Sequence, residues 1–280
     1  MASLSHPAVT AEPPGHGESA IRFEDVTITF EDRPVLDGVS FNLAGGETKI
    51  ILGVAGAGKT TALKLALGLL KPDSGRIYVL GQEITGIPEE QLFSLRRKMG
   101  MVFQESALFD SLTVRENVAY RLHEDHDLDE DAIEQRVREA LRFVELEHTL
   151  DMFPDELSGG MRRRVAIARA IVTQPAIVLY DSPTAGLDPV TSTTIIELLV
   201  KERDAFHTSS LMVTHRLQDA WVMATHVFDA SQNRMLEAPP EARGSIRVSF
   251  LVLREGSVIF DGSALELAES ADPYIREFIA

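Results

Sequence analysis

The 280-residue chain is expected to form an α/β fold with a parallel sheet, and two stretches lead to that expectation. Residues 50–70 read IILGVAGAGKTTALKLALGLL, which is an apolar strand, a glycine-rich turn and a helix-forming run. Residues 176–181 read AIVLYD, a strand of the buried type that ends in a carboxylate. Ligands of parallel α/β sheets bind beyond the carboxyl ends of the strands, so Asp181 is expected to face such a crevice.

The glycine-rich turn matches the phosphate-binding pattern G-x-x-x-x-G-K-[ST] in the strand and helix context that the pattern requires. Glycines permit backbone conformations closed to residues with a Cβ, so successive N–H groups can point at phosphates, and the helix N-terminus adds partial positive charge. Lys59 is expected to contact the β and γ phosphates of ATP, and the Thr60 hydroxyl to coordinate Mg²⁺. The residues of this turn predicted to contact the nucleotide are Gly53, Val54, Ala55, Gly56, Ala57, Gly58, Lys59, Thr60 and Thr61.

Asp181 is predicted to be a further magnesium ligand. The alternative is that its carboxylate only caps the turn that follows, SPT.

Composition narrows the classes of function. The longest apolar runs have strand length, shorter than the roughly 18 residues of a membrane span. There is no cysteine, which excludes disulfides, thiolate metal sites and thiol nucleophiles. The formal net charge of −16 disfavours a nucleic-acid partner. No lysine or arginine precedes Arg22 and no apolar secretory segment is present, so residues 1–20 are expected to be a flexible tail.

Five further stretches stand in one order along the chain. They are VTITFEDRPVL with Phe30, MVFQESALF with Gln104, ELSGGMRRR with Ser158, Gly159 and Gly160, AGLDP with Asp188, and MVTHR with His215. With these stretches the chain resembles an ATPase subunit of the ABC transporters, from Ile21 to about Gly262. The resemblance implies an ABC ATPase domain at 21–262, a P-loop α/β core with an antiparallel β edge and a helical subdomain.

The resemblance assigns roles to these residues. Phe30 would stack on adenine, with a core aromatic on a strand as the alternative. Gln104 would meet Mg²⁺ and link the nucleotide to a membrane permease, and Asp188 would belong to the D-loop. His215 would contact the γ-phosphate.

The signature Ser158, Gly159 and Gly160 precedes a helix expected from about Met161 to Gln174, so it offers a second anion site at a helix N-terminus. In the family this site closes over the ATP held by a second ATPase subunit, and a homodimer with two nucleotides is implied.

The region between Gln104 and the signature predicts a helical subdomain at about 105–159. The run DEDAIEQRVREALRFVEL has an amphipathic helical pattern with an acidic first turn. Its apolar face is expected to contain Ile133, Val137, Ala140, Leu141 and Val144.

Two charged motifs near this region have competing interpretations. His123 and His126 have a spacing that could hold a metal, but a solvated loop is preferred. Arg162, Arg163 and Arg164 suggest a membrane or protein contact, but a solvated helix face is preferred.

The last part of the domain departs from the family pattern. Residues 229–249 are predicted to be an inserted surface loop, with a contact to a regulatory partner or to the second subunit as the alternative. The following stretch predicts a hairpin that turns at Glu255 and Gly256. Residues 263–280 are expected to form a C-terminal helical extension.

The signature is followed by Met161, where most of the family carries glutamine. This methionine, residues 104–120 and the ending DPYIREFIA look most like the ATPases of Mce and Mla-type systems. The resemblance implies transport of phospholipid or other hydrophobic molecules across a bacterial envelope, with an integral-membrane permease and an MCE-type lipid-binding protein. It also implies a place on the cytoplasmic face of the inner membrane.

Two other functions remain open. One is an importer ATPase for polar solutes such as amino acids. The other is a non-transporting ATP clamp of the DNA-repair or translation type, which the acidic charge, the single nucleotide site and the lack of a coiled-coil or zinc insertion disfavour.

Ser182 follows Asp181 at the position where the family carries a catalytic glutamate. Serine can hydrogen-bond a water but cannot take its proton at neutral pH, so slow hydrolysis is expected while binding survives. Three explanations are open: a native serine with slow hydrolysis or with support from His215, a native serine in a subunit that pairs with a competent one, or an engineered trap. A native serine is favoured, because glutamine would be the more natural trapping substitution.

Overall fold

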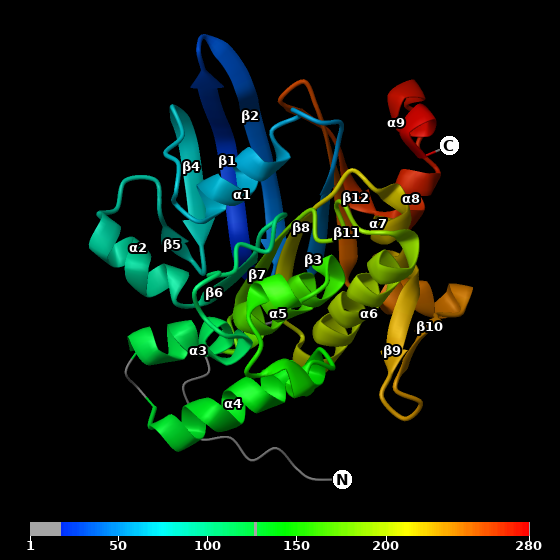
Figure 1. The fold of residues 1–280 in the computed structure, drawn as a ribbon. Coiled ribbons are helices and arrows are strands. Elements are labelled where there is room, and N and C mark those ends of the chain that lie inside the picture. Colours follow the sequence, from blue (N-terminus) through cyan, green and yellow to red (C-terminus); the bar gives the residue numbers. More distant parts are fainter. Residues whose placement is uncertain (1–17, 126–127, 280) are drawn as a thin grey trace.

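The computed structural model describes residues 18–125 and 128–279 (Figure 1). Within these residues the chain forms a four-stranded antiparallel sheet, a six-stranded sheet and a two-stranded hairpin. The α/β class and the antiparallel edge expected from the sequence are both confirmed. The antiparallel sheet has the order β2-β1-β4-β5, and its strands are β1 (Ser19–Phe30), β2 (Arg33–Ala44), β4 (Ser74–Val79) and β5 (Gln82–Glu83).

The six-stranded sheet positions the functional residues. Its order is β12-β11-β3-β8-β7-β6, and all neighbours are parallel except β11 and β12. The strands are β3 (Thr48–Leu52), β6 (Met99–Val102), β7 (Ile177–Asp181), β8 (Ser209–Val213), β11 (Val248–Arg254) and β12 (Ser257–Ser263). Every residue of β3, β7 and β8 is buried, as expected for parallel strands covered on both faces.

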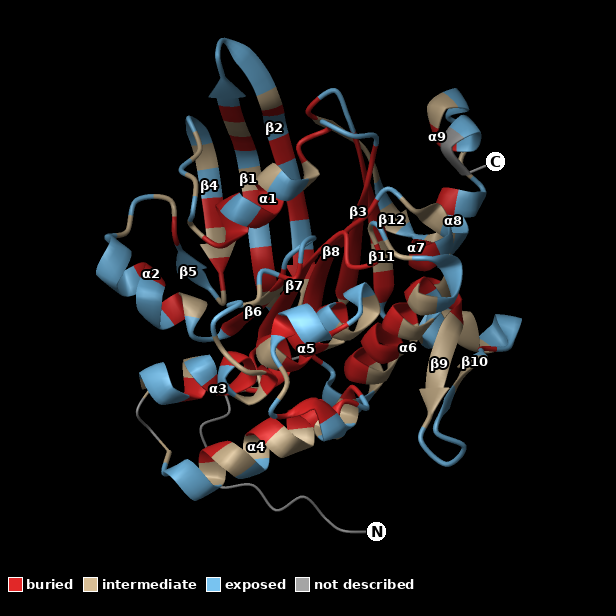
Figure 2. Cartoon of the chain, viewed as in Figure 1, coloured by how far each residue is buried: buried red, intermediate tan, exposed pale blue. Residues whose placement is uncertain are grey.

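Helices cover both faces of this sheet, and successive residues of a strand therefore enter different cores. Leu179 of β7 joins the core on the side of α1 (Lys59–Ala66) and α2 (Glu89–Arg96), whereas Val178 and Tyr180 join the core on the opposite side. That opposite side carries α5 (Gly159–Ile171), α6 (Pro189–Phe206) and α7 (Leu217–Thr225). Figure 2 shows the central strands β3, β7 and β8 and the inward sides of α5 and α6 as buried.

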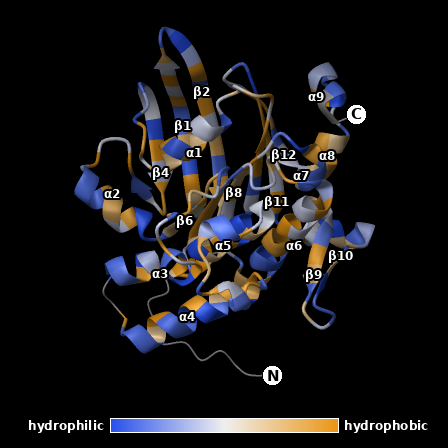
Figure 3. Ribbon diagram, in the orientation of Figure 1, coloured by the Kyte–Doolittle hydropathy of each residue, from blue (hydrophilic) through white to orange (hydrophobic). Residues whose placement is uncertain are grey.

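Residues 105–159 contain α3 (Val114–Asp125), α4 (Glu130–Phe143) and the short 3₁₀ helices η1 (Glu147–Thr149) and η2 (Pro154–Glu156). Asp129 caps α4 by accepting a 2.8 Å hydrogen bond from the Ala132 N–H. The alternation of hydrophilic and hydrophobic residues along α4 is visible in Figure 3. The apolar face expected from the sequence is confirmed, since all of its members are buried in the core shared with α5: Ile133, Val137, Ala140, Leu141 and Val144.

Three expected boundaries differ from the structure. Strand β1 begins at Ser19, so it overlaps the end of the tail expected at 1–20, and the rest of that tail, residues 1–17, lies outside the described residues. Helix α5 begins at Gly159 because Ser158 is its N-cap, and it ends at Ile171. Gln174, the expected last helical residue, instead has a positive φ of 52°. In the described part of the chain, no helix has both the length and the apolar character to cross a membrane.

Residues 229–249 lie largely at the surface, as expected, but they do not form an irregular loop. Strands β9 (His226–Asp229) and β10 (Arg234–Glu237) pair in an antiparallel hairpin, and η3 (Pro240–Ser245) follows. The hairpin is held on α6 by bonds from the Phe228 N–H to Asp204 and from the Met235 N–H to Glu197. The sequence of the segment itself does not predict these bonds, because their acceptors, Asp204 and Glu197, lie on α6.

The end of the described chain agrees better with expectation. Strands β11 and β12 form the predicted hairpin, and Glu255 and Gly256 at its turn have φ values of 50° and 81°. The residues after it form α8 (Ala264–Ala268) and α9 (Pro273–Ile279). The solvated loop preferred for the two histidines is wrong for His123, which lies in the last turn of α3, and His126 lies outside the described residues.

Candidate functional site

Four strands of the six-stranded sheet end side by side, and each is followed by a residue singled out in the sequence. The chain leaves β3 into Gly53, β8 into Thr214 and His215, β7 into Ser182, and β6 into Phe103 and Gln104. The register pairs Asp181 with Val213 and Ile51 with Val213, so these ends lie at one edge. The parallel topology therefore gathers stretches that are up to about 160 residues apart in the chain.

The turn after β3 has the backbone that a phosphate-binding loop needs. Gly58 has a φ of 92° and precedes α1 as its N-cap, where no side chain caps the helix. A Cβ at Gly58 would lie 2.6 Å from the Val35 carbonyl oxygen, so a larger residue does not fit. The first N–H groups of α1 are thus left for an external acceptor.

Lys59 folds back over the loop. Its ammonium group donates to the carbonyl oxygens of Gly53 at 2.7 Å and Val54 at 2.8 Å. Burial lowers the pKa of Lys59, and the nearby Asp181 carboxylate opposes that shift. The loop carbonyls give this partly buried ammonium group only neutral acceptors. A bound phosphate would add a negatively charged acceptor.

Thr60 and Asp181 meet across the end of β8. The Thr60 hydroxyl donates to Asp181 Oδ1 at 3.2 Å, and the Ser182 hydroxyl lies 3.5 Å from the same oxygen. Burial raises the pKa of Asp181, and the bonds from Thr60 and Ser182 oppose the shift. A hydroxyl beside a buried carboxylate is a donor set that fits Mg²⁺, which prefers oxygen ligands and would relieve the cost of the buried charge.

Ser182 is held in an unusual backbone conformation. It is buried, its φ is 47°, and its N–H donates to the Val213 carbonyl at 2.9 Å. Non-glycine residues rarely adopt positive φ, and such conformations gather at functional sites. The serine is therefore fixed at the carboxyl end of β7, next to the carboxylate.

His215 is exposed, and the segment that carries it is held in place by contacts of the next residue, Arg216. Arg216 donates to the Ser192 hydroxyl at 2.8 Å and forms an ion pair with Asp219 at 3.4 Å. The buried Asp219 also accepts a hydrogen bond from Thr184, two residues after Ser182. This network joins the segment after β8 to the turn after β7 and to α6.

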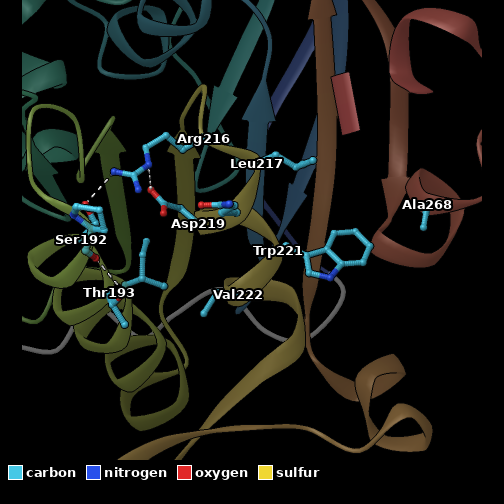
Figure 4. Close-up of a pocket in the computed structure, with 11 residues that line it drawn as sticks. Ser192, Thr193, Arg216, Leu217, Asp219, Trp221, Val222 and Ala268 are labelled. Atoms are coloured by element: carbon cyan, nitrogen blue, oxygen red, sulfur yellow. Dashed lines mark hydrogen bonds and ion pairs between the residues drawn. The ribbon is translucent and has the colours of Figure 1, made fainter. Parts of the chain in front are cut away.

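A cavity of about 700 Å³ opens beside that network, between α6, α7 and α8 (Figure 4). The Trp221 indole extends from α7 toward the segment that carries Ala268. None of the lining residues belongs to the loop 53–61, so this cavity is distinct from the phosphate-binding loop.

The signature residues form a second group with the D-loop. Ser158 caps α5 by accepting a 3.2 Å bond from the Met161 N–H, and Asp188 caps α6 by accepting a 3.0 Å bond from the Thr191 N–H. The hydrogen bonds that Asp188 accepts from the Thr191 hydroxyl and N–H lower the pKa of its carboxylate. A Cβ at Gly160 would lie 2.4 Å from the Thr191 side chain, so the glycine lets the two helix starts approach. Gly159 is exposed.

The structure therefore brings the predicted residues together in two groups. Lys59, Thr60, Asp181 and Ser182 interact around the loop, while the signature and D-loop residues interact with one another at the starts of α5 and α6. Gln104 is exposed after β6. Phe30 is 45% exposed at the end of β1, so the alternative that it is a core aromatic is wrong.

The solvated face predicted for the three consecutive arginines is wrong for Arg163. Its side chain is buried and donates to four backbone carbonyls, those of Phe103, Gln104, Ser182 and Ala185. The signal was present in the sequence, because Arg163 stands three and four residues before the apolar Ala166 and Ile167 and therefore shares a helix face with them. The structure shows both of these residues fully buried. Arg216 and Asp219 also could not be singled out from the sequence, because no local motif distinguishes them.

Known proteins match both the sequence and the fold. The ABC transporter family model matches residues 36–185. The chain is 36% identical over 270 residues to the protein TRIGALACTOSYLDIACYLGLYCEROL 3 of Arabidopsis thaliana, covering 92% of this chain and 72% of that protein. It is 31% identical over 259 residues to the intermembrane phospholipid transport system ATP-binding protein MlaF of Escherichia coli K12, covering 92% and 88%.

The methionine import ATP-binding protein MetN of Bifidobacterium longum is 37% identical over 225 residues, which are 78% of this chain and 56% of that protein. The chain thus spans just over half the length of this importer ATPase. Solved structures agree on the fold. A dimeric post-hydrolysis state of the ATP-binding cassette MJ0796, bound to ADP and Pi, has a TM-score of 0.71 at 29% identity and covers 87% of this chain and 98% of its own.

The cbiO1 subunit of a Clostridium perfringens ABC transporter complex has a TM-score of 0.72 at 29% identity, covering 92% of this chain and 94% of its own. A family model that matches more than half of the chain agrees here with relatives aligned over most of its length. This protein belongs to the ABC transporter family and is an ABC-type ATPase, the ATP-binding subunit of such a transporter.

Proposed function

We propose that the loop 53–61 holds the phosphates of ATP and that Lys59 contacts the β and γ phosphates. Thr60, Asp181 and Gln104 are the proposed ligands of Mg²⁺, since their oxygen donors match its preference. The ion would supply positive charge against the phosphate oxygens when it is bound. Phe30 stacks on adenine, an assignment supported by its exposure at the end of β1.

The signature residues Ser158, Gly159 and Gly160 serve the nucleotide of a second subunit. The observation that supports this assignment is their separation from the loop: α1 and α5 lie on opposite faces of the sheet, Ser158 bonds to α5, and Gly160 lies against Thr191 of α6. A two-fold homodimer would place each signature over the partner's ATP. Asp188 and His215 then act at the closed interface, His215 on the γ-phosphate.

The transported cargo is a phospholipid or another hydrophobic molecule of a bacterial envelope. The observation that carries this proposal is coverage, because the alignment spans 88% of MlaF but only 56% of MetN. The chain then acts with an integral-membrane permease and an MCE-type lipid-binding protein, at the cytoplasmic face of the inner membrane. Residues 105–159 form the helical subdomain that receives the permease.

The test is purification of the complex from native membranes through a tag on this chain. Mass spectrometry is expected to identify a permease and an MCE-type protein, and lipid extraction is expected to recover bound phospholipid. The reconstituted complex should move a fluorescent phospholipid in an ATP-dependent manner, and a Lys59→Ala complex should not. A complex without an MCE-type protein and without lipid would contradict the proposal.

A second candidate is an importer ATPase for polar solutes such as amino acids. It is favoured by the identity to MetN, which is 37% over 225 residues, against 31% over 259 residues for MlaF. The same purification separates the two, since an importer would bring a solute-binding protein in place of the MCE-type protein.

Ser182 is proposed to be a native residue that slows hydrolysis without weakening ATP binding. The residues proposed to bind the nucleotide are unaffected by this serine. Its hydroxyl lies 3.5 Å from the Asp181 carboxylate, which can accept a hydrogen bond from it. The hydroxyl can orient a water but is a poor base at neutral pH. His215, or a partner subunit with a glutamate, would then support turnover.

A further inference from the structure

Arg163 occupies a place that the roles proposed above leave unexplained. It stands in the second turn of α5, five residues after the signature serine, and its side chain is 4% exposed. An arginine this deeply buried requires compensation for its charge, because desolvation of a cation is costly. Burial lowers the pKa of Arg163, with Glu105 and Asp181 as the nearby opposing charges.

Backbone oxygens provide most of the compensation. Arg163 Nη1 donates to the Phe103 carbonyl at 3.2 Å and lies 3.5 Å from the Ser182 carbonyl. Nη2 donates to the Gln104 carbonyl and lies 3.4 Å from the Ala185 carbonyl. In the described structure Nε has no hydrogen-bond partner. The planar guanidinium group thus acts as a four-way link between backbone segments.

Both linked segments carry residues of the candidate nucleotide site. Phe103 and Gln104 follow β6, and Ser182 and Ala185 follow β7, directly after the Asp181 carboxylate. A second α5 arginine, Arg169, donates to the Ser106 and Ala107 carbonyls at 2.8 Å each. The segment after β6 is therefore attached to α5 at two points, whereas the Ser182 turn is attached through Arg163.

This arrangement has a mechanical consequence. A movement of α5 with α3 and α4 must either carry both segments along or break the bonds to Arg163. The same link constrains the Ser182 peptide, whose N–H bonds to Val213 and whose φ is positive. Displacement of that peptide would shift the hydroxyl relative to Asp181.

We propose that Arg163 is a positioning residue that couples the segment carrying Gln104 to the Ser182 turn, so that the position of the helical subdomain sets the geometry for hydrolysis. In the assembled transporter this link would transmit contact with the membrane partner to the ATP site, a step that rests on the proposed function above. Arg163 itself does not touch the nucleotide in this proposal.

The test compares Arg163→Gln and Arg163→Lys with the matched control Arg164→Gln. Arg164 is the next residue of the same helix, and its side chain donates to the Val144 carbonyl, away from the ATP site. Hydrolysis of radiolabelled ATP, which detects very slow turnover, is measured for each chain alone and with its membrane partner. ATP binding is measured in parallel with a fluorescent nucleotide.

The expected result is a division between binding and turnover. Arg163→Gln should keep the Kd for nucleotide within about threefold, because the proposed phosphate and metal ligands are unchanged, and should lower kcat at least tenfold. The ratio of partner-stimulated to basal rate should fall toward one. Arg163→Lys should recover part of the rate but not the ratio, because a point charge cannot link four carbonyls. Arg164→Gln should behave as the unmodified chain.

A loss of folded protein would reduce all rates in proportion and leave the stimulation ratio and the Kd unchanged. The proposal is overturned if Arg163→Gln keeps both kcat and the stimulation ratio within twofold of the unmodified chain, or if Arg164→Gln is equally affected. If the unmodified chain shows no stimulation by a membrane partner, the proposed function fails instead. The kcat and Kd of the isolated chain then still decide whether Arg163 positions the Ser182 turn.

Discussion

The two faces of the six-stranded sheet each carry a helix start suited to an anion, and they differ in how the first N–H groups are satisfied. Helix α1 follows Gly58, which offers no side-chain cap, whereas α5 follows Ser158, which already accepts from the Met161 N–H. The first start is ready for a phosphate without rearrangement. The second is stable without a ligand, which suits a surface that meets ATP only when another subunit closes.

The same two faces each hold a buried carboxylate. Asp181 projects on the α1 side, toward Lys59 and Thr60, and Glu202 of α6 lies on the other side with the Tyr180 hydroxyl 3.3 Å away. Burial raises the pKa of both, and that of Glu202 to about 7. The difference shows that burial alone does not make a site. Asp181 lies beside the phosphate-binding loop with Thr60 and Lys59, whereas Glu202 is buried among Tyr180, Thr208 and Arg203, away from that loop.

The largest expected effect concerns turnover on the α1 face. Ser182→Glu should raise steady-state Mg-ATP hydrolysis by about 10² to 10⁴-fold, since it supplies the general base that serine lacks. The assay uses the chain with its permease, and the Lys59→Ala control should show no ATP hydrolysis. If the serine and glutamate forms turn over at similar rates, another group supplies the base, and His215 is the first candidate.

A change at the cap of α1 should cost stability. Gly58→Ala is expected to lower the free energy of unfolding by about 2–4 kcal/mol, because it adds a strained positive φ to a clash with Leu36 and the Val35 carbonyl. The matched control is Gly56→Ala, which has a φ of 82° but no atom within 4 Å of the added Cβ, so it carries only the strain. Urea unfolding measures both. Equal losses would show that packing at Gly58 is unimportant.

The buried carboxylate behind the site predicts a pH dependence. The pKa of Glu202 is raised in the folded chain, so the folded state binds its proton more tightly than the unfolded state. Stability from this group therefore decreases as pH rises from about 4.5 toward 7 and levels off above. Glu202→Gln should remove roughly 1 kcal/mol of the loss between pH 6 and pH 8.5.

Urea unfolding of both chains at the two pH values measures this effect. Arg203, Asp204, Thr208 and Tyr180 surround the carboxyl group and are unchanged in the variant. Parallel pH dependences of the two chains would mean that Glu202 is ionised in the folded protein throughout this range.

The smallest effect is expected at the cap of α5. Ser158→Ala should lower stability by about 1 kcal/mol through loss of the bond from the Met161 N–H. Nucleotide affinity of the monomer should be unchanged, while ATP-driven dimerisation, followed by light scattering, should weaken. A loss of affinity in the monomer would place Ser158 at the same chain's nucleotide, against the separation of the two helix starts.

Local patterns determined much of this protein. The phosphate-binding loop, the apolar face of α4, the turn at Glu255–Gly256 and the strand that ends at Asp181 could all be predicted, because each depends on neighbours within a few residues. The resemblance to ABC ATPases supplied roles for Gln104, Ser158 and His215, which no local pattern defines. The sequence also showed the serine at position 182.

Only the tertiary structure decided which distant groups meet. The order β3-β8-β7-β6 brings Thr60 to Asp181, and the packing of α5 against two strand ends buries Arg163 among four carbonyls. The β9–β10 hairpin and the Arg216–Asp219 pair depend in the same way on groups of α6. The physical reason is that a hydrogen bond or a buried charge is stabilised by partners far apart in the chain, whereas helix and turn preferences are properties of adjacent residues.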